Sequence, residues 1–145
     1  MKDLCLESAS VLLDKIRKGE NSSVDICNNY IKRIEQFDKD VKAWAYFDKN
    51  FLIEQAKAAD EYRLSGKPLG RLHGLPIGIK DIFGTDDMPT ECGTTIRKGV
   101  RTKDDAFIVQ LLKESGAIIM GKTVTTEFAY FDPGKTTNPH DYNRT

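Results

Sequence analysis

The chain has no excess of either charge, because its 145 residues include 22 basic and 22 acidic side chains. A protein that binds nucleic acid or an anionic membrane by electrostatic attraction carries a surplus of positive charge. We therefore expect neither of these partners. The chain also lacks an apolar run near the roughly 20 residues that a membrane helix needs. Its first residues contain no apolar stretch long enough for a secretory signal.

Cysteine and histidine are scarce. Cys5, Cys27 and Cys92 are widely separated and odd in number, which argues against a disulfide framework and favours a reducing compartment. We expect the cytosol. His73 and His140 lie far apart, and no cysteine or histidine pair has the spacing of zinc ligands, so we predict no metal site.

Hydrophobic periodicity predicts an α/β protein. Amphipathic helices are expected at residues 8–18, from Ser22 or Ser23 to about residue 37, at residues 50–65, and from a cap at Thr102 or Asp104 to Gly116. Strands are expected at residues 41–47, 75–83 and 117–120, with Val41, Ala43, Ala45 and Phe47 on one face of the first. This order of elements favours a layered α/β fold.

The predicted sheet is small. About three strands are fewer than the five or six of an average sheet, and residues 131–145 form a long polar loop. We therefore interpret the chain as the first part of a larger domain.

The sharpest formal motif is misleading. Residues 116–123 match the phosphate-loop pattern of glycine, four residues, and Gly-Lys-Thr. In a working phosphate loop the four intervening residues form an open turn whose amides face phosphate. Here they are Ala, Ile, Ile and Met, which are typical of a buried strand. We predict a strand at this position and no nucleotide site. The acidic pairs at residues 86–87 and 104–105 are interpreted as turn and helix-cap residues.

One lysine lies near the end of a predicted strand. Leu75, Ile77 and Ile79 would share one face of this strand, and Gly78 and Lys80 would lie on the other. A glycine two residues before the lysine lets another backbone or a ligand come close. A lysine that is held away from water loses part of its preference for the charged form and can then accept a proton.

Several blocks, read in order, resemble the amidase signature family of hydrolases. They are residues 70–81, 88–94, 116–123 and 126–129, followed by Asn138-Pro139. The likeness spans nearly the whole chain. It implies an amidase signature fold, a mixed sheet covered by helices, of which residues 1–145 are the amino-terminal portion of a single domain. Within this portion, residues 4–66 are the helical region and residues 67–145 hold the strands and the catalytic lysine.

The resemblance implies chemistry with two serines and one lysine, and with no metal or organic cofactor. Lys80 matches the position of the catalytic lysine, and Phe128 and Tyr130 match positions near the substrate. The serines of the family follow the Asn-Pro loop. The last serine here is Ser115, so we match no residue of this chain to either of them. We therefore expect the 145 residues alone to have no amidase activity.

Three interpretations remain open. The first is part of an amidase that hydrolyses a small-molecule amide to an acid plus ammonia or an amine. The second is the A subunit of a glutamine-dependent tRNA amidotransferase, which needs partner subunits. The third is a non-catalytic interaction protein that retains half of an amidase fold. The first two require a carboxyl-terminal portion or a partner that supplies the serines.

Overall fold

The computed structural model describes residues 3–145. The α-helices are α1 (Ala9–Lys18), α2 (Ser23–Val41), α3 (Lys49–Leu64) and α4 (Phe107–Glu114), and the strands are β1 (Trp44–Phe47), β2 (Pro76–Lys80) and β3 (Ile118–Thr123). Three short 3-10 turns, Leu4–Leu6, Thr95–Arg97 and Glu127–Ala129, complete the elements. Among residues 3–145 no helix is both long and apolar enough to cross a membrane.

Capping side chains set the start of the first three α-helices. Ser8 accepts a hydrogen bond from the Val11 N–H at the start of α1. Ser22 and Asp25 form a reciprocal capping box at the start of α2, and Asp48 caps α3. Each cap satisfies backbone donors that have no partner within the helix.

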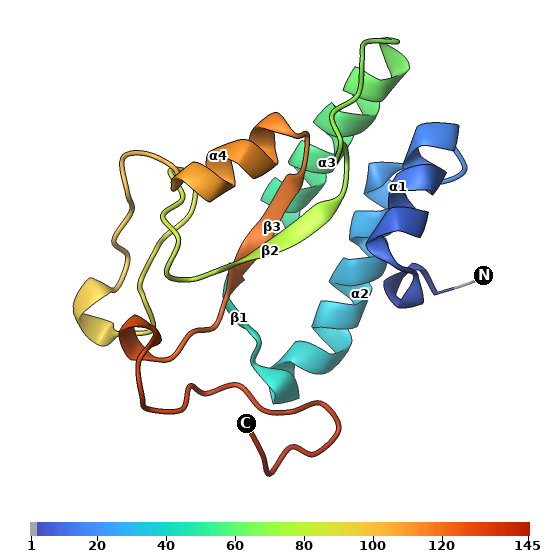
Figure 1. The fold of residues 1–145 in the computed structure, drawn as a ribbon. Helices are drawn as coiled ribbons and strands as arrows, with labels where there is room; N and C mark the ends of the chain where they lie inside the picture. Colours follow the sequence, from blue (N-terminus) through green and yellow to red (C-terminus); the bar gives the residue numbers. More distant parts are fainter. Residues whose placement is uncertain (1–2) are drawn as a thin grey trace.

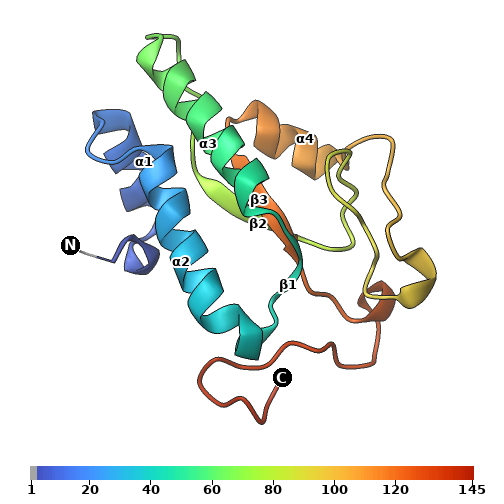
Figure 2. The same ribbon diagram turned by 180° about the vertical axis from the view of Figure 1, so that it is seen from behind.

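The sheet is mixed, with the strand order β1-β3-β2. The central strand β3 pairs antiparallel with β1 and parallel with β2. Cys27 and Ile31 of α2 and Leu52 and Ala56 of α3 pack with Ile118 and Met120 of β3. Val109 of α4 packs with Ile79 and Ile119 in a separate cluster. Figures 1 and 2 show α3 and α4 on opposite sides of the sheet.

The predicted α/β class is confirmed, but two elements differ from expectation. The first strand begins at Trp44, because α2 continues to Val41. Ala45 is exposed, whereas Trp44, Tyr46 and Phe47 are half-buried, so the predicted face of this strand is wrong. The antiparallel register shifts between Trp44 and Tyr46, and this irregularity breaks the simple alternation of side chains.

Helix α4 also differs from expectation. Neither Thr102 nor Asp104 caps it, since its first turn follows Ala106 and has no side-chain cap. Its buried residue is Val109, while Phe107, Ile108 and Leu111 are exposed. The apolar residues that predicted the helix therefore lie on its outer face. The segment after Tyr130 has no helix or strand, and Figure 1 shows it passing below the end of α2. There the Thr137 N–H donates to the carbonyl of Val41.

Candidate functional site

Lys80 is the last residue of β2 and lies opposite Thr123 in the parallel register. Two residues earlier, Gly78 lies opposite Gly121. A Cβ atom on Gly78 would lie 3.1 Å from Cη2 of Trp44 and 3.0 Å from Cγ2 of Thr123. Since side chains alternate along a strand, Lys80 projects from the same face as Gly78, on which the indole of Trp44 packs.

The Lys80 side chain is exposed. No hydrogen bond or ion pair involves its ammonium group within the part of the chain that the structure describes. The expectation that this lysine lies away from water is therefore wrong for these 145 residues. The physical reason is that β2 is an edge strand, so no neighbouring strand covers its outer side.

The residue after Lys80 is held firmly. The Asp81 N–H donates to the carbonyl of Thr123 over 2.9 Å, and the Asp81 carbonyl accepts from the Cys92 N–H over 3.0 Å. The Asp81 carboxylate pairs with Lys122 Nζ over 3.1 Å, and both side chains are almost completely buried. Burial lowers the pKa of Lys122, although the hydrogen bond and the negative charge of Asp81 act in the opposite direction.

Lys122 occupies the lysine position of the phosphate-loop pattern. It lies within β3, as the strand prediction expected, and its side chain is fully buried. An ammonium group that is enclosed by protein acceptors cannot contact a nucleotide phosphate. The structure thus confirms the strand and gives Lys122 a partner that the motif did not indicate.

Phe128 and Tyr130 belong to the segment around the Glu127–Ala129 turn. Phe128 is 53% and Tyr130 76% exposed. The Phe128 N–H donates to the carbonyl of Cys92 over 2.8 Å. Two backbone hydrogen bonds therefore connect this turn, through Cys92, to Asp81 beside Lys80. No direct contact of either aromatic ring with Lys80 is found among residues 3–145.

Backbone strain gathers at this junction. Cys92, Phe128 and Ala129 have positive φ angles of 56°, 47° and 60°, a region that non-glycine residues rarely adopt. Beside them is a cleft of about 470 Å³, whose lining includes Asp81, Glu91, Thr94, Thr125, Asp132 and Lys135. Lys80 does not line this cleft. Strained residues often occur at functional sites, which makes the surroundings of Asp81 and Cys92 the part of the molecule most consistent with one.

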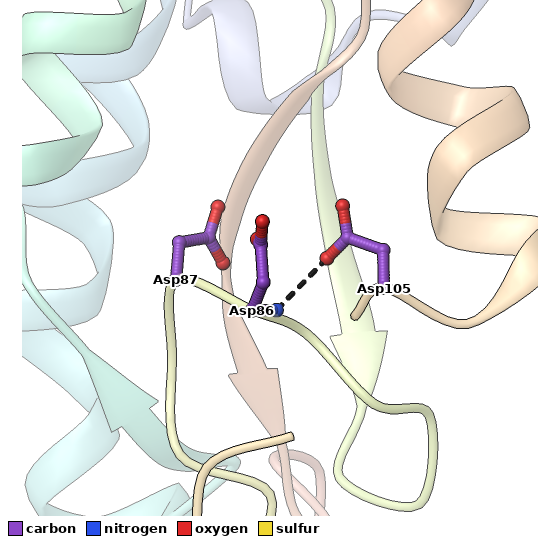
Figure 3. Close-up of side chains that lie close together, drawn as sticks. All are labelled: Asp86, Asp87 and Asp105. Carbon is purple, nitrogen blue, oxygen red and sulfur yellow. Dashed lines mark hydrogen bonds between the residues drawn. The ribbon is translucent and has the colours of Figure 1, made fainter. Parts of the chain in front are cut away.

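Three carboxylates lie together on the far side of the same loop. Figure 3 shows Asp86, Asp87 and Asp105, with a hydrogen bond from the Asp86 N–H to the Asp105 carboxylate. Lys113 Nζ lies 3.0, 2.8 and 2.7 Å from them, respectively. Partial burial alone would lower the pKa of Lys113, but its hydrogen bonds to Asp105, Asp87 and Asp86 outweigh burial and raise it. The cluster is thus a lysine site, and the expectation that these residues act only in turns and caps missed its ion pairs.

Comparison with known proteins places this geometry in a family. The family model for amidases matches residues 25–145. The chain belongs to the amidase family. It is 36% identical over 150 residues to the A subunit of the glutamyl-tRNA(Gln) amidotransferase of Thermobifida fusca, and 35% identical to that of Salinispora arenicola. Each match covers 99% of this chain and 30% of the relative.

Solved structures of amidases share the fold. The native peptide amidase of Stenotrophomonas maltophilia superposes with a TM-score of 0.81 at 28% identity, over 91% of this chain and 27% of its own. A bacterial aryl acylamidase of the amidase signature family shares the fold with a TM-score of 0.86 at 21% identity. The chain spans about 30% of the length of the curated relatives it matches.

Proposed function

We propose that residues 1–145 are the amino-terminal part of an amidase that hydrolyses a carboxylic amide, with Lys80 as the proton acceptor. The observation that supports this best is the placement of Lys80. It ends β2 beside Gly78, its ammonium has no partner among residues 3–145, and its face of the strand is open to solvent. Polypeptide outside the 145 residues would cover that face and shift Lys80 toward its neutral form.

In this proposal the neutral amine of Lys80 accepts a proton, relayed by one serine, from the hydroxyl of a second serine. That hydroxyl oxygen attacks the amide carbonyl, and backbone amides stabilise the developing oxyanion. The C–N bond then breaks, the proton passes to the departing nitrogen, and ammonia or an amine leaves. Water releases the acid from the resulting ester and restores the serine. Both serines lie outside this chain, so the 145 residues alone would not turn over amides.

A second candidate is the A subunit of a glutamine-dependent tRNA amidotransferase. The observation that favours it is that the Thermobifida and Salinispora relatives have this name. The reaction at Lys80 would be the same, with glutamine as the amide and ammonia as the useful product, and further subunits would be needed. Three free thiols, Cys5, Cys27 and Cys92, are consistent with the cytosolic location that we propose for either enzyme.

The test is a joined protein in which residues 1–145 replace the matching 30% of the Thermobifida relative. We expect ammonia release from glutamine or simple carboxamides, measured with an ammonia-coupled assay. The carboxyl-terminal part expressed without residues 1–145 is the control and should be inactive. Glutamine as the only substrate would favour the tRNA amidotransferase. If the joined protein folds but hydrolyses no amide, both enzymatic candidates are contradicted and the non-catalytic interaction protein is left.

A further inference from the structure

Lys122 is the largest fully buried side chain among residues 3–145. Its ammonium group lies 2.7 Å from Thr90 Oγ1, 3.1 Å from the carbonyl oxygen of Pro89 and 3.1 Å from Asp81 Oδ1. A lysine ammonium has three protons to donate, and three acceptors surround this one. The residue therefore joins β3, the end of β2 and the loop at residues 89–90 at a single point.

Asp81 receives the rest of this network. Besides pairing with Lys122, its carboxylate accepts from the Glu91 N–H over 3.2 and 3.3 Å. Its own N–H and carbonyl are bonded to Thr123 and Cys92. One residue earlier, the Lys80 carbonyl accepts from the N–H groups of Ile82 and Phe83, over 2.8 and 3.0 Å. The backbone on the carboxyl side of Lys80 is thus fixed by several independent bonds.

We propose that Lys122 is a positioning residue for Lys80 and acts through Asp81. This inference rests on the catalytic role proposed above for Lys80. The ion pair fixes the side chain of Asp81, and Asp81 fixes the peptide plane between it and Lys80. The direction in which the exposed ammonium of Lys80 projects from the edge of the sheet follows from that plane.

The charge of Lys122 has a purpose that an apolar residue would not serve. Burying an ion pair costs desolvation energy, and a well-packed apolar pair is often equally stable. A charged pair with directed hydrogen bonds, however, accepts few alternative geometries. Placing it next to Lys80 selects one arrangement of the strand end. A displacement of about 1 Å at a reacting group can cost about 100-fold in rate.

The first test uses the full 145-residue chain. In the Lys122→Met variant Asp81 keeps its charge without a partner, so we expect a roughly 100-fold or larger rise in the unfolded fraction. The control is Ile26→Ala, which opens a cavity at a fully buried residue of a different cluster. Urea concentrations are chosen so that both variants have equal global stability. Amide hydrogen exchange is then measured by NMR.

We expect the N–H groups of Asp81, Glu91 and Cys92 to exchange at least about tenfold faster in Lys122→Met than in Ile26→Ala. Equal rates would show that Lys122 contributes only to global stability and would overturn the inference. If Lys122→Met does not fold, Asp81→Asn keeps a side-chain acceptor but removes the charge. The same three amides should then lose protection, and unchanged protection would overturn the inference as well.

The second test uses the joined protein described above. Lys122→Met should lower kcat by about 10- to 100-fold while KM stays within about twofold. An active joined protein whose kcat is unaffected by Lys122→Met would overturn the positioning role and leave the proposed function intact. A joined protein that is inactive with Lys122 in place would contradict the proposed function instead, and the exchange measurement would then decide the positioning role alone.

Discussion

Gly78 of β2 lies opposite Gly121 of β3, and the indole of Trp44 packs against both. The two glycines leave the space that the ring occupies, on the face of the sheet from which Lys80 projects. A Cβ atom on Gly121 would lie 2.6 Å from the carbonyl oxygen of Tyr46, whereas one on Gly78 would meet only side chains, at 3.0 Å or more.

Gly121→Ala should therefore destabilise the chain more than Gly78→Ala. The backbone of β1 cannot yield as a side chain can, so we expect a loss of about 2–3 kcal/mol for Gly121→Ala and about 1 kcal/mol for Gly78→Ala. Trp44 is the only tryptophan, and its fluorescence reports unfolding in urea. Equal losses for the two variants would contradict this account of the contact.

The ion pairs of Lys113 should make stability depend on pH. Partial burial acts to raise the pKa of Asp105, but hydrogen bonds from Lys113 and from the Asp86 N–H outweigh it and lower that pKa. The stabilisation from a lowered carboxyl pKa is present above the unfolded value of about 3.9 and is lost as the pH falls through the folded value.

We therefore expect Lys113→Met to be less stable than the original chain by about 1 kcal/mol at pH 7, a small value because the pair is partly exposed. The difference should shrink as the pH falls below about 4. Urea midpoints at pH 7, 5, 4 and 3 test this. A difference that persists undiminished at pH 3 would mean that packing of the Lys113 stem, and not its charge, is responsible.

The thiol of Cys27 should resist modification. Burial raises its pKa to about 12, with a further contribution from the negative charge of Asp60, and its side chain is fully buried. In a Cys5→Ser/Cys92→Ser variant, a disulfide reagent at pH 8 should react with Cys27 only at the rate of unfolding. Rapid reaction in the folded chain would show that the packing between α2 and α3 opens readily.

The outer face of α4 should cause self-association. Phe107 is 74% exposed, and Ile108 and Leu111 are also exposed on this short helix. A contiguous apolar patch of this kind is typical of an interface. Phe107→Glu/Leu111→Glu should give a smaller sedimentation coefficient than the original chain at the same concentration. Leu64→Glu, at an exposed leucine outside α4, is the control. A monomeric original chain would contradict this expectation.

Local signals in the sequence predicted most of the fold. Ser8, Ser22 and Gly19 mark helix ends through their own hydrogen bonds or positive φ, so the sequence nearby determined these boundaries. The face of β1 was wrong because an irregular register interrupts its alternation. The outer face of α4 was wrong because hydrophobic spacing reports an apolar stripe without showing which partner covers it.

The candidate site was only partly predictable. Lys80 was found because its block matches a family, and the structure places it at the end of the predicted strand. The ion pair of Asp81 with Lys122 was missed, since the two residues are 41 positions apart and meet only through the parallel pairing of β2 and β3. A lysine within an otherwise apolar strand was the one signal, because a buried charge requires a partner.

The most direct test of the central claim is the effect of Lys80→Ala on amide hydrolysis by the joined protein, with Lys57→Ala on the exposed side of α3 as the matched control. We predict that Lys80→Ala lowers kcat/KM by at least about 100-fold at unchanged stability, whereas Lys57→Ala changes it by less than about twofold. Hydrolysis by Lys80→Ala at the rate of the original joined protein would contradict the assignment of Lys80 as the proton acceptor.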